Sequence, residues 1–564
     1  MHDPLKRIET AQSQLETTRI ENITARFLIA MFLVIVTIVP ITQTIFDRTI
    51  FSAISFTTIS SVHEKSGGQW NSFFQTLFRF NRATLQTLQS IDDTISEHSL
   101  VTKLGRPTIQ FLLSSTLGSE TSQVHEGSSG WLFYAKDVSH VTGKGFLEKN
   151  YLLKRKSSGT SLTPQPQPDP RLALYDLHAQ LSRRGITLIV MPTPVKPSIH
   201  TGELARDKHV RQLVHNASYQ DFIAELRSHK LLVFDVSSTL NLSSDKPLYL
   251  TSDTHWRPDT VGQIADALAT FISRHIPLTT DDTRTYESQP ITITNAGDTS
   301  RLLGLEQYRP ALYPSEEITI HQVTTTSGHL WKPTTNAEVL LLGDSFTNIF
   351  SLGSMGWGTS AGLAEQLSLS LQKPLDRISQ NNNGAFASRA ELANQIARDT
   401  TRLDNTKVVI FQFATRELSQ GDWKLIHFRD HEKEVPNTLE TFIRPFRDQP
   451  LQIVGRIQEM GRVPTPGMVP YKDHILGIHL NGVTSISERT DFDGTELMVY
   501  VWSMQENELT AISEYSAGDS IQLQVVPWTN VYNELGGINR GELSNPSTRL
   551  AEPWWGELTE GENQ

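Results

Sequence analysis

One serine of this chain stands where a nucleophile is expected, in the tripeptide Gly343-Asp344-Ser345. The apolar run Val339–Leu342 before it is typical of a buried strand, which would place the serine at the carboxyl end of a sheet, where open α/β folds bind ligands. The glycine permits a sharp turn, and the amides that follow, such as that of Phe346, can face a developing oxyanion. A serine in this setting indicates acyl transfer or ester hydrolysis through an acyl-serine.

The same tripeptide occurs a second time, as Gly518-Asp519-Ser520. Polar residues precede it, and an alternating apolar pattern, Ile521-Leu523-Val525, follows it. That pattern predicts a turn that leads into a half-exposed strand. Context therefore favours Ser345, and Ser520 is not expected to be catalytic.

A serine nucleophile needs a base, and His255 is the best placed of the 18 histidines. It lies in Asp253-Thr254-His255-Trp256, before a helix that is expected to start near Pro258. In extended backbone, residues two apart share a face, so Asp253 can hold one ring nitrogen of His255 while the other accepts the serine proton.

Two other interpretations of this segment remain open on the residues alone. Asp253 could cap the following helix beside an incidental histidine, or the pair could be half of a metal site. The metal interpretation is the weaker one, because the chain has no cysteine and no His-x-x-x-His pair to supply further ligands. We therefore expect no metal.

The elements that would position these residues form an α/β pattern from about residue 171. Unalternated apolar runs predict strands covered on both faces, and helices between them imply right-handed parallel crossovers. The expected fold is a doubly wound parallel sheet with helices on both faces and an irregular insertion at 276–335. The predicted strands are Ile186–Met191, Leu231–Val236, Val339–Leu342 and Lys407–Phe413, with helices near 172–181, 219–226, 258–274, 359–371 and 387–402.

The N-terminal part carries one long apolar run, Phe27–Phe46, without a charged residue. Its length suits a bilayer core, and 26 mostly polar residues precede it, so an uncleaved transmembrane signal anchor is predicted in preference to a buried soluble helix. Positive charges before the run place residues 1–26 in the cytoplasm and the bulk of the chain in the periplasm, outside the inner membrane. Residues 47–126 are predicted to form a helical membrane-proximal region.

In the C-terminal part of the sequence, apolar and polar residues alternate with a period of two. Residues 427–450 resemble a linker, and 451–564 predict a small antiparallel β domain. Four tryptophans there, Trp502, Trp528, Trp554 and Trp555, suggest a carbohydrate-binding surface, although core positions would explain them equally well. Asp491-Phe492-Asp493-Gly494 is interpreted as a turn, because it lacks the remaining ligands of a calcium loop.

Composition excludes several function classes. The net charge of −11 provides no positive field for a phosphate backbone, so nucleic acid is not an expected partner. The absence of cysteine removes disulfides and thiolate catalysis, which leaves covalent acyl chemistry to a serine.

Taken together, these motifs resemble the alginate O-acetyltransferase proteins of the AlgJ and AlgX type, which are SGNH-hydrolase-like. The resemblance covers about residues 120–425, and we place the catalytic domain at 127–426. It implies transfer of acetyl groups to a polysaccharide outside the cytoplasmic membrane, with a membrane-bound O-acyltransferase as donor partner and no cofactor. The motifs that carry it are Gly130-Trp131-Leu132-Phe133-Tyr134, Pro192-Thr193-Pro194-Val195-Lys196, Asp253-Thr254-His255-Trp256, Gly343-Asp344-Ser345 and the strand that leads to Arg416.

The resemblance also implies residue roles. Ser345 would be the nucleophile, His255 the general base and Asp253 its orienting carboxylate. Arg389 and Arg416 fall where such proteins have arginines near the site, although either can simply pair with a carboxylate.

Other assignments are weaker. Lys196 could line the same edge or be a solvated loop residue, and the amides of Phe346 and Gly384 could hold the oxyanion. The segment Phe411-Gln412-Phe413 departs from the Trp-Glu pair often seen in the family. An O-acetyl esterase of the same fold and a non-catalytic polysaccharide-binding protein remain the alternatives to an acetyltransferase.

Overall fold

The computed structural model describes residues 123–559, with gaps, and four residues near the N-terminus. The gaps are 159–164, 208–209, 211, 243–245, 280–284, 304–311, 429–440, 447–448, 467–468, 470, 487–491, 493 and 544–547. Contacts divide the chain into two units, Met1–Gln110 and Phe111–Gln564, and only Arg26, Ile29, Ala30 and Leu33 of the first are described.

Several sequence predictions therefore fall outside the described residues. They include nearly all of the apolar run Phe27–Phe46 and of region 47–126, most of the linker 427–450, and the aspartates Asp491 and Asp493. Within the part of the chain that is described, no helix is both long and apolar enough to cross a membrane.

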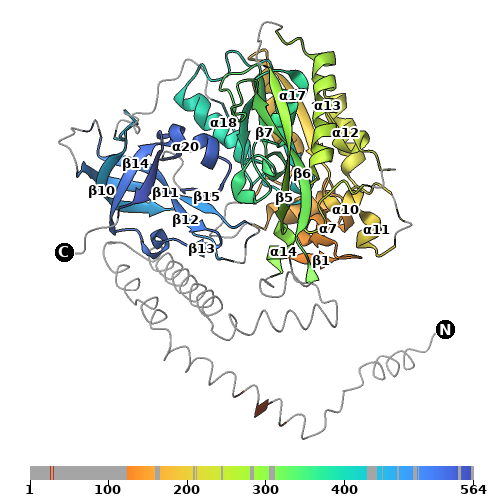
Figure 1. Ribbon diagram of the computed structural model, residues 1–564, viewed down its shortest axis with the longest axis horizontal. Coiled ribbons are helices and arrows are strands. Elements are labelled where there is room, and N and C mark those ends of the chain that lie inside the picture. Colours follow the sequence, from red (N-terminus) through yellow and green to blue (C-terminus); the bar gives the residue numbers. More distant parts are fainter. Residues whose placement is uncertain are drawn as a thin grey trace, which may run out of the picture. The chain divides into compact units, whose positions relative to one another are not determined.

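The centre of the second unit is a five-stranded sheet in which every pairing is parallel. Its order is β4-β3-β9-β7-β8, so the chain crosses over repeatedly, and the predicted parallel sheet is confirmed. Figure 1 labels its strand β7. The strands are β3 (Thr187–Thr193), β4 (Leu232–Val233), β7 (Val339–Gly343), β8 (Asp376–Ser379) and β9 (Val408–Ala414).

Apolar side chains cover both faces of this sheet. Ile189 and Leu341 belong to one buried cluster, whereas Leu188 and Leu340 belong to the other. Apolar and polar residues do not alternate along these strands because both faces of the sheet are buried. Helices α13 (Pro258–His275) and α17 (Leu363–Leu371) contribute to the first cluster, and α9 (Pro170–Ser182), α12 (Tyr219–Ser228) and α18 (Ala387–Arg398) to the second.

Two elements of this layer differ from the prediction. The strand expected at Leu231–Val236 ends at Val233, because the carboxylate of Asp235 accepts the Ser237 amide at 3.1 Å and starts the 3-10 helix Val236–Thr239. The edge strand β8 was not predicted, since it begins with two charged residues. One of them, Asp376, is 2.6 Å from the buried guanidinium of Arg402.

The insertion at 276–335 was expected to be irregular, but its described residues contain regular elements. It contains the strands β5 (Tyr286–Asn295) and β6 (Glu316–Thr325), which pair antiparallel over their whole length, and the short helix α14 (Asp298–Leu302). Alternating isoleucines, such as Ile318 and Ile320, face the first core cluster and fix the hairpin on it. The alternation was present in the sequence, but it is weak because threonine fills the outward positions.

The C-terminal part forms a separate seven-stranded sheet of order β13-β12-β16-β14-β10-β11-β15, and β12 also pairs with β11. Two of its pairings, β11–β15 and β12–β16, are parallel, so the predicted antiparallel domain is mostly but not wholly antiparallel. Its strands are β10 (Leu451–Met460), β11 (His474–Ser485), β12 (Glu496–Gln505), β13 (Glu508–Leu509), β14 (Ser520–Pro527), β15 (Asn539–Gly541) and β16 (Trp554–Leu558), with helix α20 (Trp528–Leu535) between β14 and β15.

Candidate active site

Ser345 begins the short helix α16 (Ser345–Asn348), directly after β7. The preceding Asp344 caps this helix, since its carboxylate accepts the Phe346 amide at 2.9 Å and the Ala414 amide at 2.7 Å. The second bond reaches the end of the neighbouring strand β9. The turn that carries the serine is therefore fixed from two strands.

Gln412 adds a third restraint on this turn. Its fully buried side-chain oxygen accepts the Asp344 amide at 3.0 Å and the Thr347 hydroxyl at 2.9 Å. Gly343 leaves no room for a side chain, because a Cβ there would lie 2.2 Å from Thr347 Oγ1. The glutamine that departs from the family pattern thus holds the nucleophile turn in this chain.

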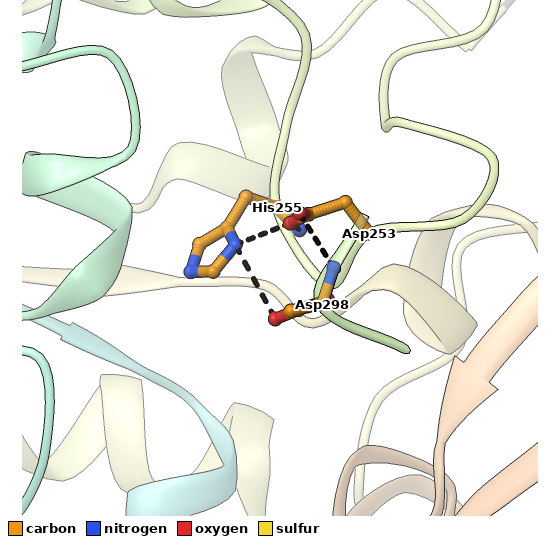
Figure 2. Close-up of side chains that lie close together, drawn as sticks. All are labelled: Asp253, His255 and Asp298. Atoms are coloured by element: carbon orange, nitrogen blue, oxygen red, sulfur yellow. Dashed lines mark hydrogen bonds and ion pairs between the residues drawn. The ribbon is translucent and has the colours of Figure 1, made fainter. Parts of the chain in front are cut away.

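His255 lies on the loop between β4 and α13, and its ring is held on one side only. Its Nδ1 is 2.6 Å from Asp253 Oδ1, whereas its buried Nε2 has no hydrogen-bond partner among the described residues. Figure 2 shows the second nitrogen pointing away from both nearby carboxylates. The other oxygen of Asp253 accepts the Trp357 indole N–H at 2.9 Å and the Asp298 amide at 3.0 Å.

These contacts shift the pKa values of Asp253 and His255 in opposite directions. Burial alone would raise the pKa of Asp253, but its hydrogen bond to His255 and the charge of that ring hold the pKa well below its ordinary value. Burial alone would lower the pKa of His255, but the hydrogen bond and charge of Asp253, with the charge of Asp298, raise it above its ordinary value. The imidazolium form is therefore favoured at this site.

Ser345, His255 and Asp253 line one cavity of about 420 Å³. The cavity is also lined by residues of the loop 381–386, of the segment 416–422 and of the β domain, namely 471–473 and 538–539. The structure thus brings the three predicted catalytic residues to a common space at the carboxyl end of β7.

The two predicted oxyanion donors have different surroundings. The amide of Phe346 already donates to Asp344, so it is not a free donor in this structure, and that assignment is corrected. Gly384 lines the cavity, and a Cβ at this position would lie 3.2 Å from Asp344 Oδ2. Gly384 therefore keeps its candidate role.

Two predicted substrate-binding cations do not line the cavity. Arg389 is 2% exposed, donates to the carbonyls of Ala385 and Lys424, and stacks over Phe411 and Trp423. Its role is structural, because helix α18 turns it into the second core cluster instead of toward the cavity.

Lys196 is fully buried behind the catalytic loop. Its Nζ donates to the carbonyls of Leu132 at 2.5 Å, Thr251 at 2.8 Å and Asp253 at 2.9 Å. Burial lowers its pKa to about 8. Neither the predicted cavity-lining position nor a solvated loop position is correct, since this lysine joins β2 (Leu132–Tyr134) to the loop that carries Asp253.

Arg416 does reach the cavity. It forms an ion pair with the buried Asp137 at 3.1 Å, and its guanidinium lies 5.9 Å from the centre of the Phe346 ring. Charge and position agree with the prediction, although one face of the guanidinium is already paired.

Asp298 is the main residue of the site that the sequence did not reveal. It comes from the insertion, and only the folded chain brings it within 3.8 Å of His255 Nδ1. Together, Asp253, His255 and Asp298 place three ligand-type atoms within 4.8 Å of one another. A metal ion there would have to displace four donors from Asp253, and the free nitrogen of His255 points elsewhere, so the geometry favours a hydrogen-bonded base over a metal centre.

Comparisons with known proteins assign the chain to a family. Residues 124–415, just over half of the chain, match the family described as an SGNH hydrolase-like domain, acetyltransferase AlgX. The chain belongs to this family.

The chain is also similar to proteins described as probable alginate O-acetylase AlgJ. It is 25% identical to that of Pseudomonas aeruginosa over 34% of this chain and 44% of the relative, and 28% identical to that of Pseudomonas fluorescens over 31% and 43%. It thus spans less than half the length of these relatives. Among solved structures, the O-acetyltransferase domain of Pseudomonas putida AlgJ shares 18% identity over 53% of this chain and 93% of that domain, with a TM-score of 0.40.

Proposed function

We propose that this chain is an O-acetyltransferase that transfers acetyl groups to a polysaccharide through an acyl-serine at Ser345. The observation that carries the proposal is the buried His255, whose Nδ1 is bonded to Asp253 while its unpartnered Nε2 shares a cavity with Ser345. Membership of an acetyltransferase family supports the type of reaction.

The reaction has two steps in this proposal. His255 Nε2 accepts the proton of Ser345 as Oγ attacks the acetyl carbonyl, and the donor's leaving group departs with a proton from the imidazolium. A sugar hydroxyl then attacks the acyl-serine and gives its proton to Nε2, and the imidazolium passes this proton to Ser345 Oγ as the sugar ester is released. Backbone amides of the cavity wall, Gly384 among them, stabilise the oxyanion in each step.

The setting of the reaction is part of the proposal. The apolar run Phe27–Phe46 anchors the chain in the inner membrane with the N-terminus in the cytoplasm, so the cavity faces the periplasm. A membrane-bound O-acyltransferase supplies the acetyl group, and an exopolysaccharide of the alginate type receives it.

Water could replace the sugar hydroxyl in the second step, which would make the chain an esterase. A product assay with and without a carbohydrate acceptor separates the two, because a transferase forms the sugar ester faster than free acetate. A purely binding protein is less well supported, since Trp528, Trp554 and Trp555 are 4%, 0% and 4% exposed and offer no stacking surface. Only Trp502 of the four is half-buried.

The acyl-serine is tested by exposing the protein to p-nitrophenyl acetate and mapping acetylated peptides by mass spectrometry. We expect one acetyl group on Ser345 and none in the Ser345→Ala protein. Ser520→Ala is the matched control, because it removes the serine of the same tripeptide from the β domain. Equal labelling or unchanged polymer acetylation by Ser345→Ala would overturn the proposal.

A further inference from the structure

Asp298 supplies a second carboxylate beside the catalytic histidine. Its Oδ2 lies 3.8 Å from His255 Nδ1, and its side chain is only 12% exposed (Figure 2). The other oxygen, Oδ1, accepts the Thr254 amide at 2.8 Å, and the backbone amide of Asp298 donates to Asp253 Oδ2 at 3.0 Å. Asp298 therefore touches each residue of the Asp253-Thr254-His255 segment.

The backbone around Asp298 is built tightly against the catalytic loop. A Cβ on Gly297 would lie 2.0 Å from the carbonyl oxygen of Ser252, so only glycine permits this approach. The same carbonyl accepts the Thr299 hydroxyl at 2.6 Å, and Ser300 closes the turn by donating to Gly297 at 2.7 Å. These contacts fix the position of the carboxylate, which is not free to swing as a surface side chain would be.

Asp298 acts on His255 through charge, not through a hydrogen bond. The single proton on Nδ1 is taken by Asp253 at 2.6 Å, and 3.8 Å is too long for a second bond. A negative charge at this distance still favours the charged form of the ring.

Several other charged groups face this pair. Arg416 opposes protonation of His255, Arg301 acts on both carboxylates, and the buried Lys196 donates to the backbone carbonyl of Asp253. The raised pKa of His255 agrees with a net excess of negative charge around the ring. Burial and the charge of Asp253 raise the pKa of Asp298 itself, so its charge depends on pH as well.

We propose that Asp298 is a positioning residue that stabilises the His255 imidazolium formed when Ser345 loses its proton. The base is then flanked by two carboxylates, one bonded to its ring and one acting on it through space. This inference rests on the proposed function, because it assumes that His255 accepts the serine proton.

The first test measures His255 directly and needs no turnover. In the full-length protein with ¹³C-labelled histidine, the His255 ring signal is assigned by its loss in His255→Gln and titrated by NMR. Asp298→Asn keeps an oxygen for the Thr254 amide but removes the charge, so we expect the titration midpoint of His255 to fall by about one pH unit. Asp298→Glu keeps the charge and should leave the midpoint close to that of the unchanged protein.

A matched control is Asp422→Asn, which removes a carboxylate from another part of the cavity wall. We expect it to move the His255 midpoint much less than Asp298→Asn does. If Asp298→Asn does not fold, Asp298→Ser supplies another neutral acceptor for the Thr254 amide. An unchanged midpoint in a folded neutral variant, or an equal shift in Asp422→Asn, would overturn the inference.

The second test separates this inference from the proposed function. In Asp298→Asn, the acid limb of kcat/KM should move to lower pH by the same amount as the NMR midpoint. If the midpoint moves but Ser345 forms no acyl adduct, the proposed function fails while the electrostatic role of Asp298 stands. If the adduct forms and neither quantity moves, only the role of Asp298 fails.

Discussion

The two Gly-Asp-Ser tripeptides of this chain are chemically identical and structurally opposite. Gly343-Asp344-Ser345 ends a buried parallel strand, and each of its residues is buried. Gly518-Asp519-Ser520 enters β14 from a turn, its residues are exposed, and Gly518 has a φ of +105°.

Their aspartates show the difference most directly. The carboxylate of Asp519 accepts the amide of Ser516, three residues earlier, at 2.7 Å. The carboxylate of Asp344 accepts a local amide as well, but its other oxygen accepts the amide of Ala414, 70 residues away, at 2.7 Å. The tripeptide thus favours a turn in both places, and the long-range bond of its carboxylate distinguishes the one that carries the candidate nucleophile.

The largest contrast is expected from the serines themselves. Ser345→Ala should lower kcat for acetyl transfer by about a thousandfold or more, because the covalent step is lost. Ser520→Ala should leave kcat unchanged, since Ser520 is exposed at the start of a strand. Steady-state kinetics on both variants measures the two kcat values. An equal loss of kcat in both would contradict the assignment of Ser345 as the nucleophile.

The next contrast concerns the base, since Ser345 shares a cavity with His255. His255 must be neutral to accept a proton, and its pKa lies above the ordinary value. We therefore expect kcat/KM to fall about tenfold for each pH unit below that pKa and to level off above it. The pH profile is the measurement, and activity that persists unchanged into acid would exclude His255 as the base.

A third contrast is expected in stability. Asp344→Ala would leave the buried amides of Phe346 and Ala414 without their acceptor, which costs about 2–6 kcal/mol at roughly 1–3 kcal/mol for each unsatisfied group. Asp519→Ala removes only an exposed turn bond and should cost about 0.5 kcal/mol or less. Urea unfolding of both variants gives the two values, and similar values would show that the long-range bond contributes little.

The smallest contrast lies between the glycines. Gly343→Ala would push a Cβ to 2.2 Å from Thr347 Oγ1, and we expect a loss of about 1–3 kcal/mol from the strained turn. Gly518→Ala meets no atom within 4 Å, and its cost, about 1–2 kcal/mol, comes only from the positive φ. Thermal unfolding compares the stabilities of the two variants. Kinetics is the sharper test, because only Gly343→Ala should also lower kcat.

The sequence predicted those parts of the site whose signals are local. The strand before Ser345 was visible as an apolar run, and Asp253 and His255 were paired by their spacing of two. Asp298 was invisible, because it lies 43 residues beyond His255 within a segment interpreted as irregular. Its position depends on the contact between Gly297 and Ser252, which no local pattern encodes.

Two buried cations were also not predictable from the sequence. Lys196 was a candidate for the cavity edge because it follows a predicted strand, and Arg389 because the family resemblance implies an arginine near the site. Each is instead buried with backbone carbonyls as acceptors. Carbonyl groups are present at every residue, so the sequence contains no distinct partner from which such a burial could be predicted.

The wall that residues 471–473 and 538–539 contribute to the cavity has a consequence for modular evolution and protein engineering. A protein cut after residue 426 would retain Ser345, His255 and Asp253 yet lose one side of the cavity that these residues line. We therefore expect that replacing the C-terminal sheet with that of another protein would alter the cavity. Recombination between relatives should preserve activity only where both halves of the wall are inherited together.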